Sequence, residues 1–111
     1  MPPADLVDAY FAHMRARDLE GLSALFAEDA VMLLPDGREV AGLPQLRAMY
    51  QYIFGAQAPS PNPLITVLGA DVVAVEIEAR FEDGTSRNTA NFFHLDADGR
   101  IARLSVYRRG D

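Results

Sequence analysis

The fold is decided by VVAVEIEARFED, the stretch from Val72 to Asp83 of this 111-residue chain. Apolar side chains occupy every second position, and glutamate or arginine occupies most of the positions between them. Successive side chains of a strand point to opposite faces of a sheet, so this pattern predicts a strand over Val72–Glu82 with one buried and one solvated face. Such a sheet needs a second layer of structure to cover its apolar face.

Two turn signals extend this strand into a sheet. Asp83-Gly84 and Asp98-Gly99 are dipeptides typical of tight hairpin turns. They separate further segments of strand-like composition, which together with Val72–Glu82 predict an antiparallel meander: Leu64–Leu68, Ser86–Asp96 and Arg100–Arg108. The C-terminal half of the chain is therefore expected to form four strands.

The N-terminal half carries the period of a helix instead. Apolar residues recur three and four positions apart, which is the pattern of an amphipathic helix that buries one face. Three segments show it: Asp5 to about Arg17, a second one capped by Asp18 and carrying Leu25 and Phe26, and Pro44 to Gly55. We expect these three helices to cover the apolar face of the sheet.

Two shorter segments connect these elements. The apolar run Val31–Leu34 is predicted to be a strand, because the turn sequence Pro35-Asp36-Gly37 follows it. Gly55–Pro63 holds three prolines in quick succession and is predicted to be a rigid surface connection. A chain of this length supports one core, so we expect residues 1–111 to form a single α+β domain.

Composition excludes several classes of function. Sixteen acids against ten bases, all of them arginine, give a net charge of −6, which disfavours nucleic acid and anionic membranes as partners. The absence of cysteine excludes disulfides, thiolate metal sites and a cysteine nucleophile. Two distant histidines and no glycine-rich phosphate loop lead us to expect no metal and no cofactor. With no signal peptide or membrane segment recognised, a cytoplasmic location is expected.

The segment DLEGLSALFAEDAV, from Asp18 to Val31, resembles a conserved stretch of the NTF2-like superfamily, in particular its SnoaL-like and ketosteroid-isomerase-like branch. The hairpin from Phe93 to Ile101 is similar to the final hairpin of that family. The resemblance implies a cone-shaped, cystatin-like fold in which three N-terminal helices pack on a curved antiparallel sheet. It also implies an apolar pocket and a homodimer formed through the outer face of the sheet.

The resemblance also implies which positions face the pocket. Ketosteroid isomerases have a tyrosine in the first helix, a carboxylate base at the end of the first strand and a protonated aspartate in the penultimate strand. Tyr10 matches the first of these, and Tyr50 matches a tyrosine at the end of the third helix. Leu34 stands at the position of the base and Asn91 at that of the aspartate, so hydrogen-bonding groups remain and the expected base is missing.

Three polar residues are candidates for catalysis or ligand contact. Tyr10 lies on the inward arc of its helix, where its hydroxyl contacts either a ligand or a neighbouring side chain. Asn91 shares strand parity with Phe93, which directs its amide inward to a ligand, to Tyr10 or to water. His13 lies at the edge of the inward arc, either reaching the pocket as a base or lying partly exposed on the helix.

The pocket wall is predicted from apolar residues that are equally ordinary core residues. Arg108, at the end of the last strand, either closes the open end as an anion clamp or lies in solvent. Phe92 and His94 have the opposite strand parity from Asn91, so we assign them to the outer face and a dimer contact. The predicted wall comprises Met14, Met32, Leu34, Met49, Tyr50, Phe54, Phe93, Leu104 and Val106.

Three hypotheses of function follow. The first is a protein that binds a hydrophobic small molecule bearing a carbonyl or hydroxyl group. The second is an isomerase or cyclase in which Tyr10 and Asn91 hold an enolate-like oxygen while His13 moves the proton. The third is a dimerisation module that uses Phe92 and His94 and has a filled cone.

Overall fold

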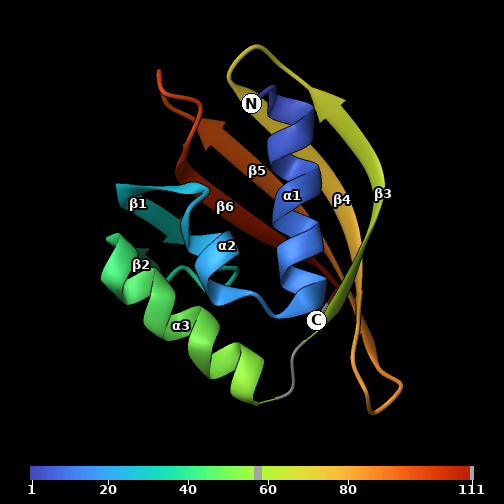
Figure 1. The fold of residues 1–111 in the computed structure, drawn as a ribbon. Helices are drawn as coiled ribbons and strands as arrows, with labels where there is room; N and C mark the ends of the chain where they lie inside the picture. The colour runs from blue at the N-terminus through green and yellow to red at the C-terminus, as the bar shows by residue number, and fades with distance from the viewer. Residues whose placement is uncertain (57–58, 111) are drawn as a thin grey trace.

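The computed structural model describes residues 1–56 and 59–110. Three helices precede or interrupt the first strands, and four long strands complete the chain (Figure 1). The elements in chain order are α1 (Pro3–Ala16), α2 (Leu19–Ser23), β1 (Phe26–Leu33), β2 (Glu39–Ala41), α3 (Leu43–Gly55), β3 (Ser60–Leu68), β4 (Val72–Arg80), β5 (Ser86–Leu95) and β6 (Ile101–Arg109).

The strands form one sheet in the order β2-β1-β6-β5-β4-β3, and the helices lie against one face of it (Figure 1). The meander from β3 to β6 is antiparallel, as predicted. The sheet as a whole is mixed, however, because β1 pairs with β6 in parallel, with Met32 beside Leu104. Local turn signals describe only strands that follow one another, and this pairing joins segments about seventy residues apart.

The pattern that opened the sequence analysis is confirmed in β4. Val73, Val75 and Ile77 are buried, whereas Glu76 is exposed. Register carries the same inner face across the sheet, because Val75 lies opposite Asn91 and Asn91 lies opposite Val106. The largest fully buried side chains form the core between this face and the helices: Phe93, Leu22, Leu46, Ile101, Leu104, Val73 and Val75.

Helix α1 has the predicted apolar stripe. Leu6, Tyr10 and Met14 are buried together with their neighbours Val7 and Phe11. The helix begins at Pro3, two residues earlier than predicted, because a proline in the first turn loses no helical hydrogen bond.

Helix α2 is shorter than predicted. Asp18 caps it by accepting a hydrogen bond from the Gly21 backbone N–H at 3.0 Å, but the helix ends at Ser23. Leu25 and Phe26 lie outside the helix: the Ile101 N–H donates to the Leu25 carbonyl at 2.9 Å, and Phe26 begins β1. Pairing with β6 therefore overrides an apolar spacing that would also suit a helix.

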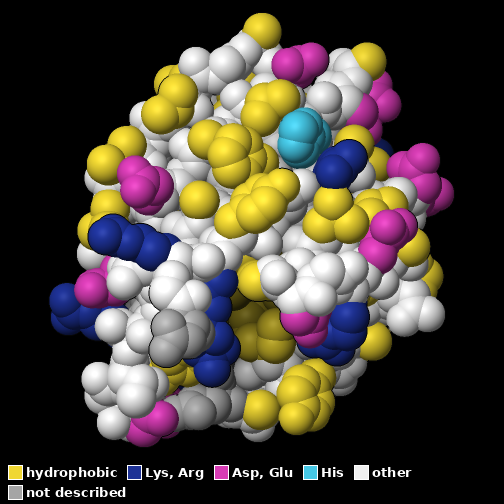
Figure 2. All heavy atoms as spheres, turned by 180° about the vertical axis from the view of Figure 1, so that it is seen from behind, with side chains coloured by type: hydrophobic (Ala, Val, Ile, Leu, Met, Phe, Trp, Pro, Cys, Tyr) yellow, Lys and Arg dark blue, Asp and Glu magenta, His cyan; other side chains and the backbone are white. Residues whose placement is uncertain are grey.

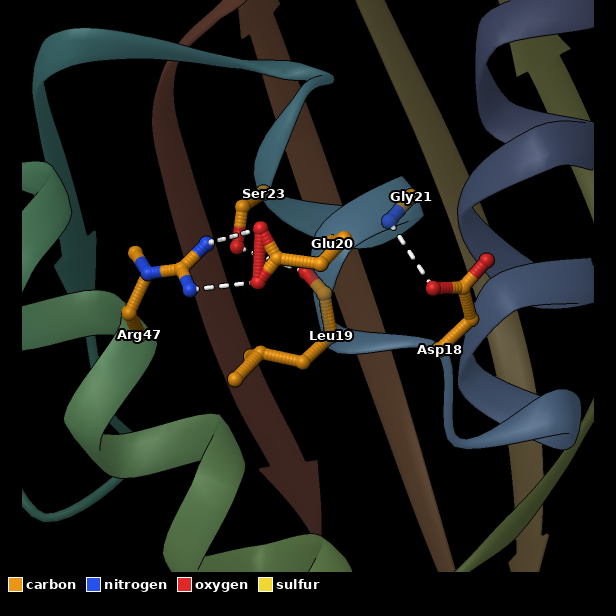
Figure 3. A network of polar contacts seen from close by, with 6 residues as sticks. All are labelled: Asp18, Leu19, Glu20, Gly21, Ser23 and Arg47. Carbon is orange, nitrogen blue, oxygen red and sulfur yellow. Dashed lines mark hydrogen bonds and ion pairs between the residues drawn. The ribbon is translucent and has the colours of Figure 1, made fainter.

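A polar network fixes α2 against α3 (Figure 3). Arg47 of α3 donates two hydrogen bonds to the carboxylate of Glu20, and this contact holds the pKa of Glu20 below its usual value. The Ser23 hydroxyl donates to the Leu19 carbonyl at 2.6 Å. The Glu20–Arg47 contact therefore joins α2 to α3, and the Ser23 bond closes the short helix on itself.

The proline-rich connection also differs from the prediction. Gln57 and Ala58 lie outside the described residues, and Ser60–Pro63 belong to β3 rather than to a surface loop. This strand is at the edge of the sheet, where prolines are tolerated because one side needs no hydrogen bonds. Among the described residues, no helix is long and apolar enough to span a membrane.

Candidate functional site

A cavity of about 330 Å³ lies between α1, α3 and the inner face of the sheet. Its wall is predominantly apolar and includes the inward-facing row of β4. Eight of the residues predicted from the sequence line it: Tyr10, Met14, Met32, Leu34, Met49, Tyr50, Asn91 and Val106.

Other predicted site residues lie elsewhere. Phe93 and Leu104 are completely buried in the core behind the wall, and Phe54 packs against the ring of Tyr50. Arg108 lies opposite Thr89 in the register and outside the lining of this cavity. Strand parity predicts the face of the sheet on which a side chain lies, but it does not predict how deeply that side chain is buried.

His13 is also outside the lining, which removes the geometric basis for its role as a base. Its Nδ1 lies 3.3 Å from Oδ2 of Asp18, and 31% of the side chain is exposed. The helix places Met14 inward, and His13 is one residue away at about 100° around the axis. The sequence allowed His13 either to reach the pocket or to lie partly exposed on the helix, and the structure places it partly exposed on the helix.

Several lining residues were not predicted. Ile77, Ala79 and Phe81 were signalled by the alternation over Val72–Glu82, although β4 itself ends at Arg80, and Thr89 was signalled by its parity with Asn91. Pro59 and Pro61 had no such signal, because their segment was interpreted as a surface connection. The remaining unpredicted residues of the wall are Phe11, Ile53 and Arg87.

Two tyrosines from different helices meet in this cavity. The Tyr10 and Tyr50 hydroxyl oxygens are 2.8 Å apart, so one hydroxyl donates to the other. The Tyr10 ring is fixed edge-on against Phe93, with ring centroids 5.0 Å apart. Two hydroxyls carry two protons and their mutual bond uses one, so the pair retains one O–H that can donate to a third group.

Both tyrosines are neutral donors. Burial raises the pKa of Tyr10 to about 12, even though its hydrogen bond with Tyr50 acts in the opposite direction. Burial also raises the pKa of Tyr50 well above its ordinary value, and the neighbouring Tyr10 adds to this effect. A phenol with a raised pKa gives up its proton reluctantly, so the pair is suited to donating hydrogen bonds rather than to acting as a base.

Asn91 contributes a hydrogen-bond acceptor to the cavity. The residue is 7% exposed, and its Oδ1 is buried without a hydrogen-bond partner in the described part of the chain. Leaving a buried acceptor unpaired typically costs about 1–3 kcal/mol. A ligand group that donates to Oδ1 would recover this free energy.

Among the described residues, the cavity lining offers no general base of the usual kinds. The lining given by the described residues contains no aspartate, glutamate or histidine, and its one charged side chain is Arg87. The described residues also contain no cluster of three or more histidine, cysteine, aspartate or glutamate side chains that could hold a metal ion. The arrangement can bind and orient an oxygen-bearing molecule, but it does not supply a carboxylate or imidazole to abstract a proton.

The buried tyrosines predict a loss of stability at high pH. In the folded state Tyr10 stays protonated up to about pH 12, whereas in the unfolded state it loses its proton near pH 10. The contribution of Tyr10 to the free energy of unfolding is therefore complete below pH 10. It falls by about 3 kcal/mol as the pH rises toward 12. Urea unfolding at a series of alkaline pH values measures the fall, and Tyr10→Phe should make the decline shallower.

Comparison with solved structures identifies the class of fold. A "putative polyketide cyclase" from Sinorhizobium meliloti is 27% identical, with a TM-score of 0.83 over 96% of this chain and 94% of that chain. An NTF2-like protein from Cytophaga hutchinsonii is 15% identical, with a TM-score of 0.85 over 98% and 91%. A computationally designed 17-OHP binder is 20% identical, with a TM-score of 0.85 over 97% and 91%.

The architecture is thus the α+β, NTF2-like or cystatin-like fold, with three helices and a mixed, mostly antiparallel sheet of six strands. The chain belongs to the SnoaL-like domain family, whose model matches residues 7–104. No curated protein matches the sequence significantly.

Proposed function

We propose that this protein binds a small apolar molecule bearing a carbonyl or hydroxyl group. One observation carries the proposal: the unpartnered Oδ1 of Asn91 and the Tyr10–Tyr50 hydroxyl pair line the same apolar cavity. A ligand hydroxyl can donate to the first and accept from the second, whereas a ligand carbonyl can accept from the remaining tyrosine O–H or from the Nδ2–H of Asn91.

Apolar contact supplies most of the affinity in this proposal. Burying about 200 Å² of apolar ligand surface contributes roughly 5 kcal/mol, and each neutral hydrogen bond adds about 0.5–1.5 kcal/mol. The hydrogen bonds therefore act mainly to orient the molecule and to discriminate between ligands. The designed 17-OHP binder, which shares the fold, supports the use of such a cone as a binding site.

The open cavity favours binding over the filled cone expected of a pure dimerisation module. The isomerase or cyclase hypothesis has less support, because Leu34 lines the cavity where the resemblance places a base, and His13 pairs with Asp18 outside it. Turnover by proton abstraction would need a base that the described lining lacks.

Titration calorimetry with 2-naphthol and with naphthalene tests this proposal. Tyr10→Phe and Asn91→Leu should each weaken 2-naphthol binding by about 0.5–1.5 kcal/mol, with less than additive effects in the double variant, while naphthalene binding is retained. Asn88→Leu is the matched control, because Asn88 is an exposed asparagine on the outer face of the same strand. Equal losses for both compounds, or an equal loss in the control, would contradict the proposed site.

The outer face of the sheet is proposed as a homodimer interface. Phe92 and Tyr107 contact each other edge-on at 5.7 Å between ring centroids, and both are exposed, as are Leu64, Ile65 and Val67 of the edge strand. Figure 2, which views the molecule from behind, shows hydrophobic side chains gathered on this side. Exposed apolar side chains gathered on one face commonly mark an interface.

Light scattering at low micromolar concentration is expected to give twice the chain mass of 12.2 kDa. Tyr107→Glu places a charge in the centre of the aromatic pair and should shift the protein to a monomer. A wild-type monomer at this concentration would refute the dimer.

A further inference from the structure

We propose that the ligand of this cavity is an apolar molecule that carries a carboxylate group. Arg87 binds this carboxylate at the end of the cavity that lies near the hairpin between β4 and β5. The inference rests on the proposed binding function and specifies its ligand class. It assigns a specificity role to Arg87, which lies four residues before Asn91 on the same strand.

The first argument is the sign of the charge. Sixteen of the 111 residues are acidic and the net charge is −6, yet no acid lines the cavity in the described structure. The one charged residue among the described lining residues is an arginine. A carboxylate entering the cavity therefore meets a cation at the wall and no anion, which favours it over a neutral or cationic molecule.

The second argument is that Arg87 is positioned and electrostatically available. Its guanidinium carbon lies 5.2 Å from the centroid of the Phe81 ring, another wall residue. No acid of the described residues forms an ion pair with it, whereas the nearby Arg17 and Arg80 pair with Glu82 and Glu78. A guanidinium presents donors in a planar fork that matches the two oxygens of a carboxylate.

The hairpin acid nearest to Arg87 in the sequence, Asp83, has partners of its own in the turn. Asp83 accepts hydrogen bonds from the Thr85 backbone N–H at 2.9 Å and from the Thr85 hydroxyl at 2.6 Å. These bonds hold it in the turn, on the far side of Thr85 from Arg87 along the chain. Among the described residues that line the cavity, Arg87 is the charged one.

The third argument is the separation of the polar groups. The pairs Val75–Asn91, Ile77–Thr89 and Ala79–Arg87 follow one another along the inner face of β4 and β5. Four residues of strand separate Asn91 from Arg87, a distance of about 13 Å between their backbones. A ligand that satisfies both has its hydroxyl or carbonyl at one end, its carboxylate at the other and an apolar skeleton between them.

Three matched probes test this inference by titration calorimetry: 10-hydroxydecanoate, its neutral methyl ester, and decanoate. The wild type should bind 10-hydroxydecanoate about three- to fivefold more tightly than the ester, since Arg87 is exposed and ion pairs at exposed sites are weak. This preference should shrink when salt is raised, because exposed charges are screened. The hydroxyl contribution, measured against decanoate, belongs to Asn91 and the tyrosines.

Arg87→Gln should abolish the preference for the acid over the ester, whereas Arg87→Lys should retain part of it. Arg100→Gln is the matched control: it removes the same charge from an exposed turn beyond the opposite end of β5. Equal binding of acid and ester by the wild type, or loss of the preference in the control as well, would overturn the role of Arg87 while leaving the proposed function intact. Failure of all three probes to bind would refute the inference and weigh against the proposed function too, which the naphthol titration tests separately.

Discussion

Phe93→Ala is expected to lower the free energy of unfolding by about 3–5 kcal/mol. Phe93 is completely buried, and its ring packs against those of Tyr10 and Phe11 at centroid distances of 5.0 and 6.1 Å. Removing it leaves a void where α1 meets the sheet, and the surrounding rings cannot all collapse into it. Because single domains are stable by only about 5–15 kcal/mol, the variant should be close to unfolding.

Urea unfolding followed by circular dichroism measures this loss. Tyr52→Ala is the control, because Tyr52 is an aromatic residue of α3 that is 76% exposed, and its removal should change stability by no more than about 0.5 kcal/mol. Similar losses in the two variants would show that the aromatic cluster does not hold the helices to the sheet.

Leu34→Asp is expected to raise proton-transfer activity above that of the natural chain. Leu34 lines the cavity at the position where the resemblance to ketosteroid isomerases places the base. A positioned base contributes about 10²–10⁴-fold to such reactions. The variant should therefore isomerise a β,γ-unsaturated ketosteroid at least about 10²-fold faster than the wild type, which should not exceed the buffer rate.

The rate is followed by the ultraviolet absorbance of the conjugated product. Leu34→Asn is the matched control, since it adds a polar group of the same shape that cannot accept the proton and should remain inactive. Substantial turnover by the wild type would mean that a base acts from outside the lining described here.

Residue patterns predicted the fold where the determinants are local. Alternation in β4 gave the buried face, and the two Asp-Gly turns gave the antiparallel meander. The parallel β1–β6 pair was missed because it is decided by contacts between the two ends of the chain. The same contacts shorten α2, whose residues Leu25 and Phe26 have a spacing that suits either a helix or the entry to a strand.

The residues of the candidate site were likewise predictable where local patterns determine their position. Tyr10 and Asn91 could be placed at the cavity because helical arc and strand parity determine the face on which they lie. The hydrogen bond between Tyr10 and Tyr50 joins residues forty positions apart, and no local pattern encodes it. The role of Arg87 was missed because a charged residue at a strand end normally lies in solvent, and only the assembled wall shows that it borders the cavity.

Binding of an oxygen-bearing ligand between Tyr10 and Asn91 is tested most directly by nuclear magnetic resonance of the side-chain amides. The chain has three asparagines, of which Asn62 and Asn88 are exposed and Asn91 is buried in the cavity wall. Adding 2-naphthol should shift the Asn91 amide signals alone and give intermolecular contacts to the Tyr10 ring. Shifts confined to Asn62 or Asn88, with Asn91 unchanged at saturating ligand, would contradict the proposed site.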